Sequence, residues 1–448
     1  MPSSIPRVAI LLGVACLGGG CGQSGPPRPR NLLFVCVDTL RADHLGAFGA
    51  EPSPSPAIDA FAASAVVFER AYAHAPWTLP SFAAILTSLY SSTTGTWTKE
   101  SRLGEDVTTL PERFRDAGFE TYGIASHVFF NRDYGLQQGF EGFDDEYCHA
   151  KGDAGWVQTT SPGMTEKALH WLGERERAER PWLLWLHYFD PHIPYVPHPE
   201  LDGGAAAGDE RALYRTEIAF TDRHVGELLA GLERLGFADD TAVVFLSDHG
   251  EAFYEHPGVH RHGFSLFDEE LRVPLAIRVP GVAPRRVSSL VRTLDLAPTL
   301  CELFGIPSDG PSDGQSFLDV LSGAERDAPA LLAELRLNEG FHARGVLDGR
   351  YKLVEDLSRG GVRLYDLVED PREARDLAPE RPDVVRELSA RMRELEERAT
   401  ELASRYGPAG AVELPAATLE HLRELGYVGG EGEEPSEEEP APLPDGER

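Results

Sequence analysis

A threonine at the start of a predicted helix is the first candidate for chemistry in this sequence. Thr78 lies in the run Ala-Pro-Trp-Thr-Leu-Pro-Ser-Phe-Ala-Ala-Ile-Leu-Thr-Ser, residues 75–88. Pro80 is tolerated only near a helix start, where free backbone N–H groups and the helix dipole favour an anion or an ionised hydroxyl. Beside a cation, Thr78 is therefore a candidate nucleophile. Taken alone, the position is more typical of a simple helix cap.

Carboxylates and imidazoles follow three apolar segments elsewhere in the chain. The segments begin at Asn31, Pro181 and Thr241, and their polar ends are Asp38, His187 with Asp190, and Asp248 with His249. Continuous apolar runs are typical of parallel strands buried on both faces, and ligands of such sheets bind beyond the carboxyl ends of the strands. We therefore expect these side chains to meet Thr78 and form a site for a divalent cation. Each Asp alone could instead be a turn former.

The elements that must position these residues alternate between strand and helix. Helices are predicted from Pro56, over Leu110–Ala117, over Glu166–Glu179 and over Glu210–Leu235, with a short strand over Thr121–Ala125. This alternation predicts an α/β fold with a doubly wound, mostly parallel sheet flanked by helices.

The character of the chain changes from about Ser288. An apolar helix over Leu294–Phe304 is followed by short segments with glycine-rich turns and by a charged helix over Pro382–Ala403. The short segments are Leu331–Leu335, Gly345–Leu347, Tyr351–Val354 and Val362–Tyr365. We therefore expect a catalytic domain over residues 31–325 and a smaller C-terminal α+β subdomain with antiparallel strands over 326–430. The tail over 431–448 is acidic and is expected to be disordered.

Net charge and cysteine content argue against some classes of function and site. The formal net charge of −31 argues against a nucleic-acid-binding protein and gives no help with an anionic substrate. A phosphate or sulfate must therefore be met by a local positive centre, most simply a metal ion. Cys36, Cys148 and Cys301 are scattered, so they predict neither a disulfide framework nor a metal-thiolate site.

The N-terminal 21 residues predict a signal peptide. Their apolar run, Val8–Leu17, is too short to span a bilayer. Small residues before Cys21, followed by a polar linker over 22–30, resemble a bacterial lipoprotein signal in which Cys21 becomes the lipidated N-terminus. Cys16 is an alternative lipidation site, and an ordinary secretion signal is another reading. Either way we expect a protein of the periplasm or cell envelope, and the lipoprotein signal further predicts that it is anchored to a membrane through the lipid.

Several motifs occur in an order that resembles the sulfatase family of the alkaline-phosphatase-like superfamily. In the larger domain they are Val37–Gly46, Ala75–Ser81, His187–His192, Ser247–Glu251, His262–Gly263 and Asp268–Pro274. In the smaller unit they are Asp348–Leu353, Leu364–Leu367 and Asp370–Pro371. The resemblance covers nearly all of residues 31–430 and implies the fold of that superfamily.

The resemblance also implies roles for individual residues. Asp38, Asp248 and His249 would bind one divalent metal ion, with Thr78 as a further ligand and as the nucleophile. His192 and His262 would hold the anionic group or protonate the leaving oxygen; His192, beside two prolines, could instead be structural. His256 and His260 lie nearby in sequence and are expected around the site or at the surface.

Two departures from the family pattern affect the predicted chemistry. Sulfatases that use formylglycine have Cys or Ser where this chain has Thr78, and Arg where it has Phe82. Threonine cannot be oxidised to that aldehyde, and threonine nucleophiles are typical of relatives that act on phospho-esters. The first motif has Thr39 where the family has a second Asp, so fewer carboxylates plus a histidine favour Zn²⁺ or Mn²⁺ over Ca²⁺ or Mg²⁺.

These observations predict a metal-dependent hydrolase of sulfate or phosphate esters. Its substrate would be a sulfated or phosphorylated small molecule, glycan or lipid. One alternative keeps the fold but makes the protein a phosphodiesterase or phosphotransferase acting on envelope lipids or glycans. Another is an inactive relative that serves as a binding lipoprotein.

Overall fold

The computed structural model describes residues 26–149, 159–176, 179–202, 204, 208–308, 310–326, 329–338 and 341–427. The predicted signal peptide with Cys21 and the acidic tail lie outside these residues. None of the helices within the described residues combines the length and apolarity needed to cross a membrane.

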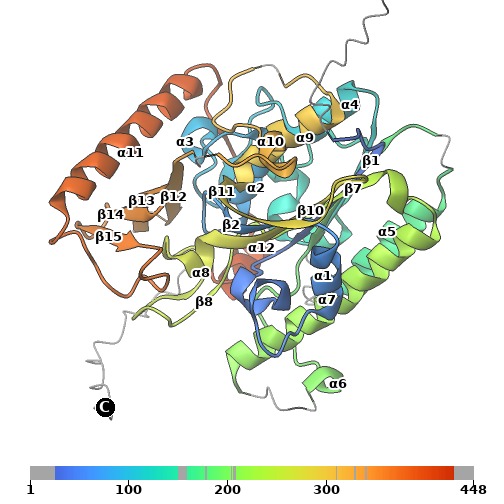
Figure 1. Ribbon diagram of the computed structural model, residues 1–448, viewed down its shortest axis with the longest axis horizontal. Helices are drawn as coiled ribbons and strands as arrows, with labels where there is room; N and C mark the ends of the chain where they lie inside the picture. The colour runs from blue at the N-terminus through green and yellow to red at the C-terminus, as the bar shows by residue number, and fades with distance from the viewer. Residues whose placement is uncertain are drawn as a thin grey trace, which may run out of the picture.

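An eight-stranded sheet forms the centre of the molecule (Figure 1). Its order is β11-β2-β10-β7-β1-β6-β4-β5, and of these strands only β10 runs antiparallel to its neighbours. The strands are β1 (Asn31–Val37), β2 (Val66–Tyr72), β4 (Glu120–Ala125), β5 (Gly142–Asp144), β6 (Trp182–Tyr188), β7 (Thr241–Leu246), β10 (Arg272–Arg278) and β11 (Arg285–Arg292).

Helices cover both faces of this sheet, as Figure 1 shows. Alternate residues of β1 face two separate apolar cores: Leu33 packs with the helices of one face and Phe34 with those of the other. The first face carries α1 (Pro56–Ala63), α5 (Ser161–Gly173) and α7 (Glu210–Arg234). The second carries α2 (Thr78–Thr87), α4 (Leu110–Asp116), α9 (Leu296–Phe304) and α10 (Leu318–Leu321). The predicted α/β class with a mostly parallel sheet flanked by helices is confirmed.

A second, four-stranded antiparallel sheet follows in the chain. It consists of β12 (Leu331–Asn338), β13 (Phe341–Asp348), β14 (Tyr351–Asp356) and β15 (Val362–Asp366), in that order. The long helix α11 (Pro382–Ala403) packs on it through Val384, Leu388 and Met392. The chain then returns to the larger sheet as α12 (Ala416–Glu424), which Figure 1 draws near the middle of the molecule and not beside α11.

The remaining elements are short. They are α3 (Ser91–Thr94), α6 (Pro199–Asp202), α8 (Asp268–Leu271) and the strand pairs β3 (Ser101–Arg102) with β16 (Gly410–Ala411) and β8 (Ala252–Phe253) with β9 (His260–Arg261).

Several element boundaries differ from those expected. Helix α5 begins at Ser161, five residues before the predicted start, because the Asp190 carboxylate accepts hydrogen bonds from the backbone N–H groups of Thr160 and Ser161. Strand β11 adds to the large sheet at the point where the sequence suggested a change of character. The sequence analysis predicted neither β2 nor α12.

Candidate active site

The carboxyl ends of three neighbouring strands bring the candidate metal ligands together. Strand β1 lies between β6 and β7, and Cys36 of β1 is in register with His187 on one side and Leu246 on the other. Asp38 follows β1 directly, and Asp248 and His249 follow β7. The parallel arrangement thus places these side chains at one end of the sheet, as the sequence predicted.

The distances within this group are short. His249 Nε2 lies 3.4 Å from Asp38 Oδ1 and 3.4 Å from Asp248 Oδ2. Coordination of a tetrahedral cation at about 2.1 Å separates neighbouring ligand atoms by roughly 3.4 Å. Donor atoms of the three residues all lie within 4.8 Å of one another, so the group could hold a metal ion.

Electrostatics within the group also indicate a cation. The side chains of Asp38 and Asp248 are fully buried, and none of their four oxygens accepts a hydrogen bond of normal geometry from the described part of the chain. Burial, then the charge of Asp248, raises the pKa of Asp38, and burial raises the pKa of Asp248 to about 8. Buried carboxylates facing each other are unfavourable unless a cation joins them. The residues present therefore fit a divalent metal ion.

The hydrogen bonds of His249 leave one ring nitrogen free to bind a metal ion. Its Nδ1 lies 3.0 Å from the carbonyl oxygen of Gly250, so Nδ1–H donates there and Nε2 carries the free lone pair. Burial, then the charge of His262, lowers the pKa of His249, which keeps the ring neutral. Gly250 is needed beside it because a Cβ would lie 2.0 Å from the carbonyl oxygen of Glu269.

Thr78 is the first residue of α2 and its hydroxyl faces the same group. Thr78 Oγ1 lies 3.2 Å from His249 Nε2. Trp77, and not Thr78, is the residue that precedes the helix, and the Thr78 side chain does not cap it. Ser81 Oγ donates to the carbonyl oxygen of Asp248 at 2.7 Å, which ties the first turn of α2 to the loop after β7.

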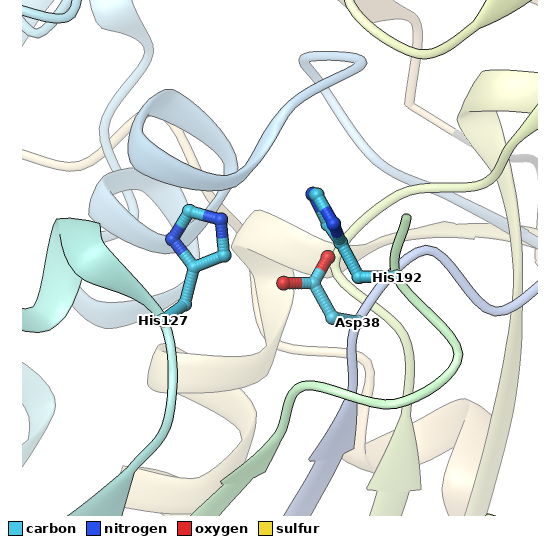
Figure 2. A group of neighbouring side chains, drawn as sticks. All are labelled: Asp38, His127 and His192. Carbon is cyan, nitrogen blue, oxygen red and sulfur yellow. The ribbon is translucent and has the colours of Figure 1, made fainter. Parts of the chain in front are cut away.

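A second group, Asp38 with His127 and His192, also brings ligand atoms within 4.8 Å of one another, and Figure 2 shows both rings beside the carboxylate. His127 Nδ1 accepts a hydrogen bond from the backbone N–H of Phe129 at 3.2 Å. In the neutral ring this assignment puts the proton on Nε2, which has no partner among the described residues. Burial, then the charge of His192, lowers the pKa of His127. His127 therefore offers a donor that suits an anion better than a cation.

Sequence reasoning did not single out His127. It follows β4, the strand beside β6, so its place after a parallel strand was the available signal.

His192 and His262 both reach the group around Thr78. His192 Nδ1 donates to the carbonyl oxygen of Ile193 at 2.5 Å, which leaves Nε2 as an acceptor, and burial, then the charge of His262, lowers the pKa of His192. His262 Nδ1 lies 3.2 Å from a carboxylate oxygen of buried Glu251, which orients the ring.

The backbone after His262 is also fixed. Gly263 has a φ of +81°, and its N–H donates to Glu270 at 2.7 Å. Glycine adopts this left-handed conformation without strain.

Tyr427, which the sequence analysis missed, completes the group. Its hydroxyl lies 3.1 Å from Thr78 Oγ1, 3.0 Å from His262 Nε2 and 3.3 Å from His192 Nε2. Burial, then the charge of Asp38, raises the pKa of Tyr427, so the phenol is neutral. A single tyrosine 349 residues from Thr78 carries no motif that could have indicated this contact.

Other residues considered from the sequence lie elsewhere. Asp190 was expected with the strand-end ligands, but its carboxylate binds the start of α5; His187, with Nε2 3.5 Å from Asp38 Oδ2, is the residue of that strand that adjoins the site. His256 stacks on Phe267, and His260 pairs with Glu210. The free thiols of Cys36, Cys148 and Cys301 are buried.

Residues 30–306 match the Sulfatase family, and residues 260–398 match the family described as N-sulphoglucosamine sulphohydrolase, C-terminal. The chain is 24% identical to N-acetylgalactosamine-6-O-sulfatase of Bacteroides thetaiotaomicron, over 86% of this chain and 98% of that protein.

Solved structures show the same fold. One, of a protein bound to its substrate D-glucosamine-2-N,6-O-disulfate, superposes with a TM-score of 0.70 at 19% identity, covering 84% of this chain and 99% of the other. The phosphonate monoester hydrolase of Agrobacterium radiobacter superposes with a TM-score of 0.68 at 23% identity, covering 83% and 96%.

Proposed function

The chain belongs to the sulfatase family, whose members hydrolyse sulfuric esters, and we propose that it is a metal-dependent hydrolase of sulfate or phosphate esters with Thr78 as nucleophile. One observation carries the proposal. The hydroxyl of Thr78 faces the same buried point as the imidazole of His249 and the carboxylates of Asp38 and Asp248, which accept no hydrogen bond of normal geometry from the described residues.

Asp38, Asp248, His249 and Thr78 would hold one divalent cation. When bound, such an ion supplies Lewis-acid chemistry: it favours ionisation of a neighbouring hydroxyl and offsets charge on the transferred group. Because the ligand set includes an imidazole, Zn²⁺ or Mn²⁺ fits it better than Ca²⁺ or Mg²⁺.

The other steps of the proposed reaction are assigned to residues of the chain. Thr78 lies in the first turn of α2, where backbone N–H groups without partners in the helix favour negative charge on its oxygen. His127 directs its Nε2–H toward the anionic group. His262, oriented by Glu251, delivers a proton to the leaving oxygen. Threonine at this position excludes a formylglycine mechanism.

Phosphoryl transfer is the second candidate for the reaction. Threonine at position 78 and Phe82 in place of an arginine favour it, because they depart from the formylglycine pattern. Transfer to another acceptor, or cleavage of a diester of an envelope lipid or glycan, uses the same nucleophile, metal ion and acid.

A side-by-side assay tests these candidates. The purified protein is loaded with Zn²⁺, Mn²⁺, Ca²⁺ or Mg²⁺ and given an aryl sulfate, a phosphate monoester, a phosphodiester and a phosphonate ester. We expect turnover of at least one ester with Zn²⁺ or Mn²⁺, and the preferred ester assigns the reaction. A protein that binds no metal ion and cleaves none of the four would instead be an inactive binding lipoprotein.

The natural substrate and location are part of the proposal. Relatives named for a sulfated sugar support a sulfated or phosphorylated glycan, small molecule or lipid as substrate. We propose that the protein acts in the periplasm or envelope, anchored through a lipid on Cys21. Metabolic labelling with a fatty acid should mark the wild type and not Cys21→Ser; equal labelling of both would contradict the assignment of Cys21.

A further inference from the structure

The C-terminal segment 415–427 ends inside the reaction centre. Helix α12 turns at Gly426, whose φ is +86°, and the N–H of Tyr427 donates to the carbonyl oxygen of Leu422 at 2.8 Å. This turn directs the Tyr427 side chain inward, where it has no solvent exposure. Leu422 and Leu425 are buried beside it in the core that includes α2.

The hydroxyl of Tyr427 lies at the point on which the reacting groups converge. Thr78 Oγ1, His192 Nε2 and His262 Nε2 surround it at 3.0–3.3 Å. A hydroxyl has one proton and two lone pairs, so three partners use all of its hydrogen-bonding capacity. His192 Nε2 is an acceptor, so the phenol proton can go to it.

A substrate ester needs the same place. The nucleophile must approach the atom under attack to roughly 3–3.5 Å, and the acid must reach the leaving oxygen. The phenol oxygen lies 3.1 Å from Thr78 Oγ1 and 3.0 Å from His262 Nε2, so it occupies the space that the group under attack would need. The side chains of Asp38, Thr78, Asp248 and His249 have no solvent exposure. An ester and Tyr427 therefore cannot occupy the centre together.

The ring of Tyr427 has aromatic neighbours. Its centroid lies 5.0 Å from that of Phe129, 5.8 Å from that of His127 and 6.0 Å from that of Trp77. The contacts with Phe129 and His127 are edge-to-face, the arrangement that aromatic rings prefer. The wall is thus shaped for an aromatic ring whose oxygen points at Thr78.

We propose that Tyr427 is an internal ligand of the active site, whose phenol oxygen occupies the place of the group that Thr78 would attack, and that segment 415–427 withdraws before a substrate ester binds. The inference rests on the proposed function, because it takes Thr78 and His262 as the groups that act on the ester. It adds a lid that competes with the substrate for the centre.

Segment 415–427 has few buried side chains that would hold it in the active site. Just before it, Gly410–Ala411 pair with Ser101–Arg102, and Val412 N–H donates to Glu100, so the chain is held up to Val412. Between residues 413 and 427, only His421, Leu422, Leu425 and Tyr427 are buried, and the other side chains of α12 are partly or fully exposed. Opening therefore exposes few apolar side chains.

Kinetics of full-length, metal-loaded variants test the lid. Tyr427→Phe keeps the ring but removes the three contacts of the hydroxyl, so we expect kcat/KM for an aryl ester to rise about 3–10-fold, mainly through a lower KM. Tyr406→Phe, a partly buried tyrosine just before the segment, is the matched control and should leave kcat/KM unchanged. An unchanged or lower kcat/KM for Tyr427→Phe overturns the lid, and a large fall in kcat would make the hydroxyl a donor to the substrate.

Binding measurements separate this inference from the proposed function, because they need no turnover. p-Cresol, the side chain of tyrosine as a free molecule, should bind Tyr427→Ala about tenfold or more tighter than it binds the wild type. In the wild type, tungstate should increase amide exchange over residues 416–427, because the anion displaces the segment. Equal binding of p-cresol to both proteins, or protection of 416–427 by tungstate, overturns the internal ligand. If p-cresol and tungstate behave as expected but no ester is cleaved, only the proposed function fails.

Discussion

Two buried clusters of charged side chains in this molecule differ in how their charges are balanced. At the active site, Asp38 and Asp248 face each other without a cationic side chain between them, and their pKa values are raised. Where the second sheet meets α8, the Lys352 ammonium lies 2.8 Å from Asp268 and 2.7 Å from Glu373. Burial alone would lower the pKa of Lys352, but these two carboxylates raise it.

The difference distinguishes a candidate functional site from a structural connection between two parts of the molecule. The chain supplies its own cation at Lys352, so that cluster is complete and connects the antiparallel sheet to the larger domain. Among the described residues no cationic side chain lies between Asp38 and Asp248, so that cluster could hold an ion from outside. A buried charge without a partner thus indicates function more strongly than a buried charge as such.

The largest expected effect concerns Thr78, the proposed nucleophile beside Asp38 and Asp248. Thr78→Ala removes the attacking oxygen and should lower kcat by about 10³-fold or more, whereas Thr78→Ser keeps the hydroxyl and should retain measurable turnover. Steady-state kinetics on the preferred ester checks this. Metal content is the control, measured with the metal ion in excess because Thr78 is also a proposed ligand; both variants should then still hold the ion through Asp38, Asp248 and His249. Turnover of Thr78→Ala at the wild-type rate would remove Thr78 from the mechanism. Mass spectrometry across residues 75–88 should also find Thr78 unmodified.

Disruption of the cluster of Lys352, Asp268 and Glu373 should lower the stability of the protein and leave catalysis unchanged. Lys352→Met leaves Asp268 and Glu373 buried without their cation, so we expect the free energy of unfolding to fall by about 3–5 kcal/mol. Arg375→Met, which breaks the exposed pair with Glu380, is the control and should cost less than about 1 kcal/mol. Urea denaturation measures both. If the two variants lose the same free energy, the cluster is not a structural joint.

Removal of the metal ion should lower the stability of the wild type, and Asp248→Asn should not respond to it. With the ion at 100–1,000 times its dissociation constant, a chelator should lower the stability of the wild type by about 3–4 kcal/mol. Asp248→Asn should lose the ion and this sensitivity, yet in chelator it should be no less stable than the wild type, because it removes one of two facing carboxylates. Elemental analysis should give one equivalent per chain; two equivalents would refute a single site.

A smaller effect should distinguish an acid from a metal ligand. His262→Ala should lower the rate for alkyl esters about 10–100-fold more than for nitrophenyl esters, because an alkoxide needs a proton to leave and a nitrophenolate does not. Kinetics on a matched pair of esters measures the difference. Equal losses together with a loss of metal ion would place His262 in the metal shell.

The pH dependence of stability should depend on a buried carboxyl away from both clusters. Burial raises the pKa of Glu334 to about 8 from a usual value near 4.5, so the folded protein holds a proton that the unfolded chain releases between these pH values. The stabilisation is fully present below pH 4.5 and is lost as pH rises toward 8, by up to about 1.4 kcal/mol per pH unit. Glu334→Gln should flatten this slope in urea denaturation between pH 5 and pH 9; an unchanged slope would show that Glu334 does not contribute.

Local patterns in the sequence were enough for the fold and for most of the metal ligands. Continuous apolar runs predicted β1, β6 and β7, and parallel strands must end together, so Asp38, Asp248 and His249 had to lie near one another. The start of α2 followed from Pro80 and the apolar residues after it.

Asp190 shows where local pattern fails. An aspartate after a strand can face the end of the sheet or cap a neighbouring helix, and the sequence does not distinguish these cases. The tertiary structure decided it, because α5 presents two backbone N–H groups to the carboxylate. His127 and Glu251, which aim or orient groups in the site, became evident only from their hydrogen bonds.

By itself, then, the sequence determined the α/β class, the strand-end ligands and the helix that begins at Thr78, because each depends on residues adjacent in the chain. Only the tertiary structure decided that Tyr427 enters the centre, that Glu251 orients His262 and that Lys352 joins the antiparallel sheet to α8. These contacts join residues far apart in sequence, and they form because buried polar groups must find partners wherever the folded chain brings them.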